Sequence, residues 1–330
     1  MKIYHIAILG AGSIAHAMAK TLRGMKEQGR PVELWAIAAR ELGRAQQFAS
    51  EEGFLHAYGS YEEMLADPEV DLVYIATPHS HHAEHIELCV NAGKAVLCEK
   101  SFTGNAKQAE RVLALAEEKG VLVTEAIWTR YMPSRTIINE IIASGEIGRV
   151  LSVTANLGYN IPNKERMLKP ELAGGALLDL GVYTLNFASM VLGDDVVRTE
   201  SIVDMTDSGV DRSETIVQYY RGGQSATLTS HFMCRMDRHG CIYGEKAYMI
   251  VDNINNPHTM DIYDDNDDHL IRHIDFPQQI TGYEYQVEAC LRALEAGQIE
   301  CPEMPHAQTI HMMQVMDALR ADWHMVYPFD

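Results

Sequence analysis

The fold of this chain is decided by the stretch Ile6-Ala7-Ile8-Leu9-Gly10-Ala11-Gly12-Ser13-Ile14-Ala15. A short apolar run ends at Gly10 and a helix-competent segment begins near Ser13, which predicts a strand, a tight turn and a helix with the pattern G-x-G-x-x-A. Gly10 permits the sharp turn, Gly12 lets the backbone approach a pyrophosphate, and Ala15 is small enough for the helix to pack closely. Unpaired N–H groups at a helix start favour phosphate, so we predict that a dinucleotide is bound by Gly10, Gly12, Ser13 and Ile14. A glycine-rich turn that only packs is the alternative.

The end of the second predicted strand bears on which dinucleotide is bound. Val32-Glu33-Leu34-Trp35-Ala36-Ile37-Ala38 is followed by Ala39 and Arg40, at the place where an acidic residue usually bonds the ribose hydroxyls of NAD. A neutral residue followed by a guanidinium suits the 2′-phosphate of NADP, which a carboxylate would repel. We therefore predict that Ala39 and Arg40 contribute to binding NADP, the preferred cofactor, while the neighbouring Glu41 keeps NAD open.

Helices and strands alternate through the rest of residues 1–125. This alternation implies parallel βαβ units with right-handed crossovers, which is the doubly wound Rossmann arrangement of an α/β protein. Cofactors bind such sheets beyond the carboxyl ends of the strands. The segments that leave the strands there, and that we expect to form the rim of the pocket, are Thr77-Pro78-His79, Glu99-Lys100-Ser101 and Glu125-Ala126.

The pattern changes in residues 126–330, which we predict to form a second domain that binds substrate. Residues 196–276 read as successive strands with short turns, and a helix is expected over 176–192 and two more near 281–297 and 306–322. A run of strands without intervening helices indicates an α+β domain with a large, open, mixed but mainly antiparallel sheet. Because one face of such a sheet needs a cover, we predict a homodimer or higher homo-oligomer formed through it.

Composition excludes several classes of protein. The formal net charge of −19 would repel a phosphate backbone, so we expect no nucleic-acid partner. We find no run of ~18 apolar residues and therefore expect no membrane-spanning helix and no membrane partner. The six cysteines form no C-x-x-C pair and the first residues show no signal-peptide pattern, which predicts reduced thiols and a cytoplasmic protein.

A group of candidate catalytic residues lies in the segment Asp179-Leu180-Gly181-Val182-Tyr183. Asp179 and Tyr183 are four residues apart, which places both on one face of the expected helix. A phenol transfers protons only if its pKa of ~10 is lowered, and an ammonium such as that of Lys100 can do this. Oxidation of a secondary alcohol needs hydride transfer and a base, so we assign Tyr183 as acid/base, Lys100 as its assistant and Asp179 as the group that orients the substrate hydroxyl. The alternative is a half-buried core tyrosine that hydrogen-bonds the aspartate.

Several motifs together resemble the glucose–fructose oxidoreductase and inositol dehydrogenase (Gfo/Idh/MocA) family over nearly the whole chain. In order they are Gly10-x-Gly12-x-x-Ala15, Thr77-Pro78 with His82, Cys98-Glu99-Lys100, Glu125-Ala126-x-x-x-Arg130-x-x-Pro133 and Gly174-Gly175-Ala176-Leu177-Leu178-Asp179-Leu180-Gly181-Val182-Tyr183. The run Trp128-Thr129-Arg130-Tyr131 and a tyrosine at 183 resemble the branch of dimeric dihydrodiol dehydrogenases and NADP-dependent D-xylose dehydrogenases.

The resemblance implies a Rossmann domain, a second domain whose sheet often forms a dimer, and Lys100 and Tyr183 as catalytic residues with Asp179 beside the substrate. It also implies that Thr77, Pro78, His79, His82, Glu99 and Lys100 line the cofactor site and that Trp128 and Arg130 line the substrate pocket. A position in the core is the alternative for Trp128. The chain departs from the common Glu-Lys-Pro pattern at Ser101, which leaves the backbone beside Lys100 less restricted.

Two possible metal sites are weaker interpretations. His81 and His85 have the i, i+4 spacing of a zinc pair but no identified third ligand. Asp264-Asp265-Asn266-Asp267-Asp268 resembles a calcium loop, yet His269 stands where glycine is required, so a solvated turn is favoured. We predict no metal.

The combined prediction is an NAD(P)-dependent oxidoreductase acting on a sugar, a cyclitol or a cyclic diol. One alternative is an enzyme that keeps its cofactor tightly bound and oxidises one sugar while reducing another. A second alternative is a non-catalytic sensor that binds a dinucleotide, which the presence of both Lys100 and Tyr183 disfavours.

Overall fold

The chain forms two compact units in a computed structural model that describes residues 2–330. The first unit contains Met1–Tyr131 and Gln279–Gln314, and the second contains Met132–Gln278 and Val315–Asp330. No pattern in the sequence predicted that Gln279–Gln314 belongs to the first unit. This segment adds helix α8 (Glu284–Glu295) and the start of α9 (His306–Asp322) to the N-terminal region.

The first unit contains a six-stranded sheet in which every neighbouring pair is parallel, as predicted. The strand order is β3-β2-β1-β4-β5-β6. Successive strands are added on one side of β1 as far as β3 and then on its other side from β4, which is the doubly wound arrangement. The short β3 was not predicted from the sequence. The strands are β1 (Tyr4–Leu9), β2 (Val32–Ala38), β3 (His56–Tyr58), β4 (Leu72–Ile75), β5 (Ala95–Glu99) and β6 (Val123–Ala126).

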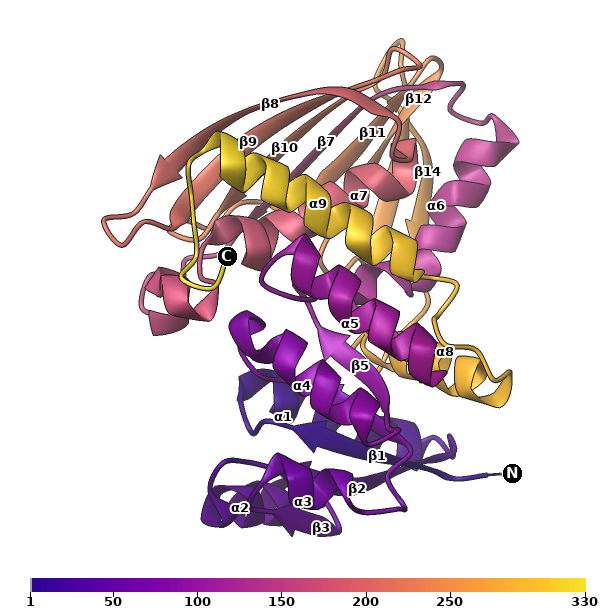
Figure 1. The fold of residues 1–330 in the computed structure, drawn as a ribbon. Helices are drawn as coiled ribbons and strands as arrows, with labels where there is room; N and C mark the ends of the chain where they lie inside the picture. The colour runs from indigo at the N-terminus through magenta and orange to yellow at the C-terminus, as the bar shows by residue number, and fades with distance from the viewer. Residues whose placement is uncertain (1) are drawn as a thin grey trace. The chain divides into compact units, whose positions relative to one another are not determined.

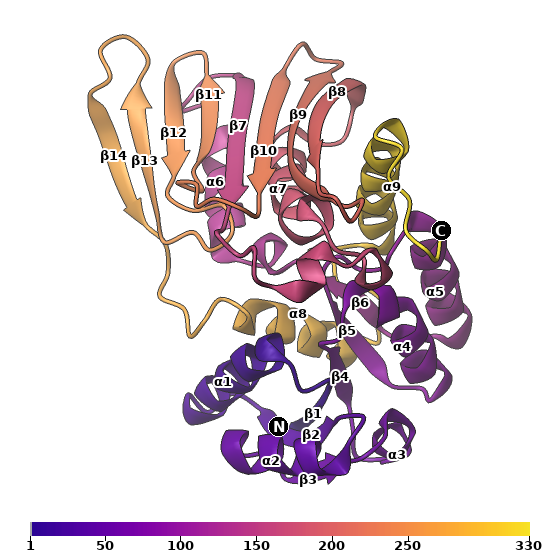
Figure 2. The same ribbon diagram turned by 90° about the vertical axis from the view of Figure 1, so that its left-hand side faces the viewer.

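Helices flank this sheet because its central strands are apolar on both faces. Every residue of β4 and β5 is buried, as a parallel sheet between two helical layers requires. Helix α4 packs beside α5 (Figure 1), and α1 packs beside α2 and α8 (Figure 2). The remaining helices of this unit are α1 (Ser13–Glu27), α2 (Leu42–Glu52), α3 (Tyr61–Leu65), α4 (His79–Asn91), α5 (Ala106–Lys119) and the 3-10 helix η1 (Trp128–Arg130).

The second unit contains the large mixed sheet that the sequence predicted. Figure 2 shows its eight strands side by side in the order β14-β13-β12-β11-β7-β10-β9-β8. Only β7 and β10 run parallel, and the other neighbouring pairs are antiparallel. The strands are β7 (Val150–Gly158), β8 (Val196–Met205), β9 (Asp211–Tyr220), β10 (Ser225–His231), β11 (Gly240–Gly244), β12 (Ala247–Val251), β13 (Thr259–Asp264) and β14 (Leu270–Asp275).

One face of this sheet is covered by helix. Helix α7 (Val182–Leu192) packs on β7 and β10, and α6 (Pro133–Ser144) precedes β7 in the same unit. The expected single helix over 176–192 is wrong in detail, because Leu177–Gly181 (η4) is a π-helix that leads into α7. The wider π turn carries Asp179, and such segments are frequent at functional sites. Two 3-10 turns, η2 (Glu165–Leu168) and η3 (Pro170–Leu172), come before it.

Two expectations from composition have different outcomes. All six cysteines are free, as predicted, and the cytoplasmic location stays a prediction. Pro170–Leu192 is long and apolar enough to cross a membrane by length and composition alone, so the expected absence of a membrane-spanning helix stays a prediction. The most apolar window of that stretch is 78% buried inside the protein, as befits the core helix beneath a sheet.

Candidate functional site

The turn between β1 and α1 has the geometry that the glycine pattern predicts. Gly10 has a φ of +102°, and a Cβ there would lie 2.9 Å from Thr77 Cγ2 and 3.2 Å from the Ala76 carbonyl oxygen. Only glycine therefore fits at residue 10. The close contact joins the end of β1 to the end of β4, the two central strands between which the order of strand addition switches.

Gly12 differs from Gly10, because nothing in the protein requires a glycine there. Its backbone is extended, with a φ of −98°, and the nearest atom to a Cβ would be the Ala76 carbonyl oxygen at 3.8 Å. Gly12 is the N-cap of α1, and no side chain caps that helix start. An uncapped helix N-terminus with room beside its first N–H groups suits a phosphate. The first turn of α1, with Ser13 and Ile14, thus fits the pyrophosphate of a dinucleotide.

Two arginines stand beyond the end of β2. Ala39 is buried and Arg40 is exposed, as expected for a residue that meets a ligand from solvent. Burial raises the pKa of the Tyr61 phenol while Arg40 and Arg44 act in the opposite direction, which places both guanidinium groups near this ring. Arg44 also donates to the Ala11 carbonyl oxygen at 2.7 Å. Sequence reasoning missed Arg44, although its place one helical turn after Arg40 was a usable signal.

His82 ties together two loops of the predicted rim. Its Nε2 lies 2.8 Å from the Thr77 carbonyl oxygen and its Nδ1 lies 2.9 Å from that of Ser101. Burial lowers the pKa of His82 to about 4, although the hydrogen bonds to the backbone carbonyl oxygens of Thr77, Ser101 and Phe102 act in the opposite direction. His79 packs edge-on against this ring, and Pro78 is the N-cap of α4. These contacts hold the loop after β4 against the loop after β5.

The loop after β5 carries Lys100, whose side chain is half-buried. The Lys100–Ser101 peptide bond is cis, and Ser101 and Phe102 are fully buried. Glu99 is buried and accepts a hydrogen bond from the Tyr74 hydroxyl. The neighbours of Lys100 are therefore fixed by packing.

Glu125, at the end of β6, is a fully buried carboxyl that belongs to the same rim. Its Oε1 accepts a hydrogen bond from the Phe102 backbone N–H at 3.2 Å. Burial raises its pKa to about 7, against the opposing effects of Arg130, Phe102 N–H and Thr309. The predicted pocket residues Trp128 and Arg130 are both buried, and Trp128 stacks on Tyr283 at 4.2 Å between ring centroids.

In the second unit the predicted residues Asp179 and Tyr183 lie on one buried segment. Asp179 is in the π turn η4, and Tyr183 is in the first turn of α7. Arg166 Nη2 donates to both carboxylate oxygens of Asp179, at 2.9 and 3.0 Å. This guanidinium, which sequence reasoning missed, balances the buried negative charge and fixes the direction of the carboxylate.

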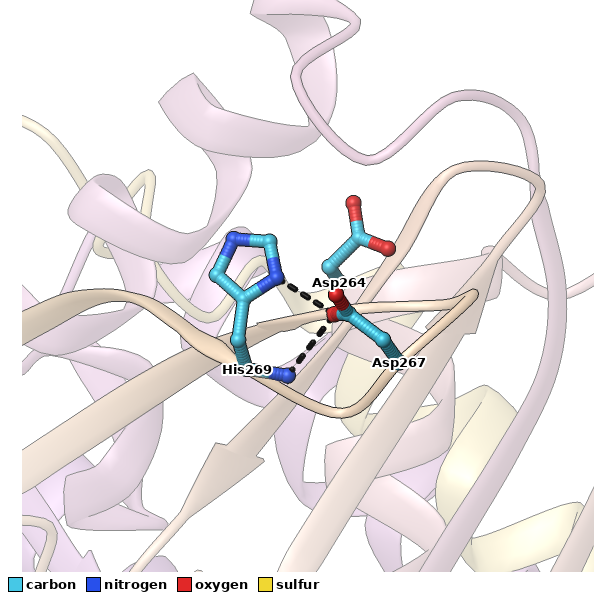
Figure 3. A group of neighbouring side chains, drawn as sticks. All are labelled: Asp264, Asp267 and His269. Carbon is cyan, nitrogen blue, oxygen red and sulfur yellow. Dashed lines mark hydrogen bonds and ion pairs between the residues drawn. The ribbon is translucent and has the colours of Figure 1, made fainter.

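The potential metal ligands have different settings. His85 bonds Thr77 Oγ1 through Nδ1 at 2.9 Å, and within residues 2–330 the pair His81 and His85 belongs to no close group of three ligand atoms. Asp264, Asp267 and His269 do form such a group (Figure 3). They lie in the turn between β13 and β14, where Asp267 Oδ1 accepts hydrogen bonds from the backbone N–H and Nδ1 of His269. Their bonds stabilise an exposed turn, as the sequence favoured, and the absence of a metal stays a prediction.

Comparison with known proteins agrees with this geometry. Residues 4–127 match the model of the oxidoreductase family with an NAD-binding Rossmann fold, and residues 137–250 match the GFO/IDH/MocA C-terminal domain. The chain belongs to the Gfo/Idh/MocA family. It is therefore an oxidoreductase, a dehydrogenase or reductase, with a domain that binds a nicotinamide dinucleotide. The predicted family and fold class are confirmed.

Relatives at about 30% identity cover nearly the whole chain. A trans-1,2-dihydrobenzene-1,2-diol dehydrogenase of Danio rerio is 32% identical, with 98% of both proteins covered, and that of Bos taurus is 31% identical with the same coverage. Among solved structures, a 3-ketoreductase from Actinomadura kijaniata in complex with NADP is 25% identical over 97% of this chain and 98% of that one, with a TM-score of 0.86. A levoglucosan dehydrogenase in complex with NADH and L-sorbose, 16% identical, shares the fold with a TM-score of 0.87 over 97% of this chain and 96% of that one.

Substitution by alanine is expected to have different effects at the two glycines of the first turn, on cofactor binding at residue 12 and on stability at residue 10. Gly12→Ala is expected to raise the dissociation constant for NADP at least tenfold, because the new methyl group occupies the space of the phosphate, and to leave the thermal midpoint nearly unchanged. Gly10→Ala is expected to lower the free energy of unfolding by about 1–3 kcal/mol or more, because residue 10 has a positive φ and no room for a Cβ. Calorimetric titration and thermal unfolding measure the two effects. Unchanged NADP affinity in Gly12→Ala would contradict the phosphate site.

The buried carboxyl of Glu125 predicts a pH dependence of stability. The folded-state pKa of about 7 lies above the usual 4.5, so the unfolded chain loses this proton first, and the group lowers the free energy of unfolding as the pH rises from about 4.5 to about 7, with no further loss above that and no cost below about 4. Glu125→Gln removes this cost. The stability of the variant relative to the parent is therefore expected to increase between pH 5 and pH 8, by on the order of 3 kcal/mol at most. Thermal unfolding over that range measures it, and a constant difference would count against the raised pKa.

Proposed function

We propose that this protein transfers a hydride between NADP and a secondary alcohol or carbonyl group of a sugar, a cyclitol or a cyclic diol. The observation that carries the proposal is the pairing of a carboxylate and a phenol on one buried segment, with Asp179 held by Arg166 and Tyr183 four residues further on. Such a pair can bind a substrate hydroxyl and exchange its proton. The names of the diol dehydrogenase and ketoreductase relatives support the class of substrate.

The proposed chemistry assigns a separate task to each side chain. The nicotinamide, when bound, accepts or supplies the hydride at the carbon that changes oxidation state. In the oxidation direction the Tyr183 phenolate takes the proton of the substrate hydroxyl, and in the reduction direction the phenol returns it. The Lys100 ammonium stabilises the phenolate by its charge. The Asp179 carboxylate accepts a hydrogen bond from a substrate hydroxyl, and Arg166 keeps that carboxylate in one direction.

The preference for NADP rests on the cations beyond β2. Arg40 is exposed there and Arg44 lies near the same tyrosine ring, so two guanidinium groups are available to a 2′-phosphate. Guanidinium groups bind phosphate with strong, charge-assisted hydrogen bonds.

We further propose that the outer face of the eight-stranded sheet pairs with a second copy of the chain. Tyr248 stacks between Tyr243 and Tyr263 in neighbouring strands on that face, and the isoleucine at 202 is 79% exposed. Aromatic and β-branched side chains are typical of a sheet face that is covered in the assembled protein. Light scattering is expected to give twice the mass of one 36.9 kDa chain, and a mass of one chain would contradict the proposal.

Removal of the phenol tests the proposed reaction. Tyr183→Phe is expected to lower kcat by roughly a hundredfold or more, because the proton then has no acceptor, while the dissociation constant for NADP stays within twofold. Lys100→Met is expected to act in the same direction, and the double variant is expected to lose no more than the larger single loss, because both groups serve one proton transfer.

A matched control is Tyr220→Phe, which removes another buried phenol, the one that donates to Gln218. It is expected to keep its kcat. The assay uses a panel of aldoses, cyclitols and cyclic diols with NADP and with NAD. Full turnover by Tyr183→Phe, or independent and multiplicative losses for Tyr183 and Lys100, would refute the assignment.

Removal of the Arg40 guanidinium tests the cofactor preference. Arg40→Ala is expected to raise the KM for NADP about tenfold to a hundredfold and to leave the KM for NAD nearly unchanged, because only NADP carries the 2′-phosphate. Lys119→Ala removes an equal charge from the exposed last turn of α5 and serves as the control. Equal losses with both cofactors would contradict a contact with the 2′-phosphate.

A further inference from the structure

Two acidic side chains are buried against the segment that carries Asp179 and Tyr183. Asp211 and Glu214 both lie on β9, and both are almost completely inaccessible to solvent. Neither belongs to the reaction proposed above. Buried carboxyl groups are costly unless they are bonded or protonated, so their place in the second unit needs a physical reason.

Asp211 holds the start of the π segment. Its Oδ2 accepts a hydrogen bond from the Leu177 backbone N–H at 2.5 Å, and the Ala176 N–H also bonds this carboxyl. These N–H groups stand at the beginning of a helical segment, where they have no partner within the helix. A carboxylate there also interacts favourably with the helix dipole. Asp211 therefore fixes the residues two and three positions before Asp179.

Glycines make room for both carboxyls at the two ends of this segment. A Cβ at Gly175, whose φ is +114°, would overlap Asp211 Oδ1, and a Cβ at Gly181 would lie 2.5 Å from Glu214 Oε1. The two acids thus lie directly against the backbone on either side of Asp179. The glycines of this motif are explained by side chains that are about 30 residues away in the sequence.

The surroundings of the two carboxyls favour a shared proton. Asp211 faces Glu214 and Tyr327, and Glu214 also faces Ser230. The Tyr327 hydroxyl donates to the Gly174 carbonyl oxygen at 2.6 Å. Arg320 lies over the Tyr327 ring and pairs with two other acids, Asp317 and Asp330.

Two neighbouring carboxyl groups in a dry environment cannot both ionise easily. Burial and the neighbouring Asp211 raise the pKa of Glu214 well above its usual range, and burial raises that of Asp211 to about 6. Asp211 Oδ1 and both carboxyl oxygens of Glu214 are buried without a hydrogen-bond partner of standard geometry, so a proton on Glu214 removes a charge that would otherwise be unbalanced, while Asp211 accepts from the Leu177 N–H through Oδ2.

We propose that Asp211 and Glu214 are a positioning pair that shares one proton and holds the Leu177–Gly181 segment in the conformation in which Asp179 and Tyr183 act. The proposal rests on the proposed function, because the segment matters for the reaction only if those two residues take part. A purely structural pair would stabilise the second unit without any specific effect on turnover.

Two substitutions of Glu214 with similar size separate these roles. Glu214→Gln keeps an N–H donor for Asp211, whereas Glu214→Leu has none. Gln218→Leu, on the same strand and also buried, removes a polar group that bonds Tyr220 and serves as the control. For each variant we would measure the thermal midpoint, amide hydrogen exchange across residues 175–183, the dissociation constant for NADP, and kcat and KM for the substrate.

Glu214→Leu is expected to speed the exchange of the Ala176 and Leu177 amides at least tenfold and to lower kcat at least tenfold, with NADP affinity within twofold of the parent. Glu214→Gln is expected to stay within threefold of the parent in exchange and in kcat. Gln218→Leu is expected to lower the thermal midpoint with neither effect. If Glu214→Leu does not fold, Asp211→Asn replaces it, and because the Leu177 N–H then loses a charged acceptor, at least threefold effects in the same directions are expected.

Three results would overturn the proposal: unchanged amide exchange in Glu214→Leu, equal losses in Glu214→Gln and Glu214→Leu, or an equal loss of kcat in Gln218→Leu. Failure of the proposed function is recognised separately, because Tyr183→Phe would then retain turnover. The exchange measurement still decides in that case whether the pair holds the segment.

Discussion

Residue 10 must be glycine for the turn after β1 to form, and the cofactor side of the protein depends on that turn. The backbone there touches Ala76 and Thr77 so closely that no Cβ fits. This contact brings the start of α1 to the carboxyl ends of the two central strands, the topological switch point at which such sheets bind dinucleotides. His82 then joins the loop after β4 to the loop after β5, so three strand ends become one surface of defined shape.

Glycines serve two different purposes in this chain, and the difference separates fold from function. Gly10, Gly175 and Gly181 are required by the protein itself, because a Cβ at each would meet another part of the same unit. Gly12 has an ordinary backbone and free space beside it, which supports the proposal that a ligand phosphate occupies that space. A glycine that the fold does not need, at an uncapped helix start, is therefore the more informative sign of a binding site.

Buried charge in the second unit is balanced in two ways. The carboxylate of Asp179 is paired with the guanidinium of Arg166, which balances its negative charge and fixes its direction. Asp211 instead bonds the Leu177 backbone N–H and faces the Glu214 carboxyl, whose pKa is raised well above its usual range by burial and by Asp211. Both arrangements act on the same short segment. One is an ion pair, and the other is a carboxyl group that accepts a hydrogen bond from the backbone. A π turn in place of a regular α-helix gives this segment a shape that needs such support.

The sequence by itself determined the order and type of the elements, the parallel sheet followed by the mixed sheet, the glycine turn and the family, because hydrophobic periodicity and the positions of glycine are local properties of the chain. It also indicated Asp179 and Tyr183 as a pair on one face. Only the tertiary structure decided that Gln279–Gln314 returns to the first unit, that Leu177–Gly181 is a π turn, and that Arg166 and Asp211 bond the segment around Asp179. Those contacts join residues from separate elements, and their geometry depends on how the strands and helices pack, for which no short sequence pattern carries the information.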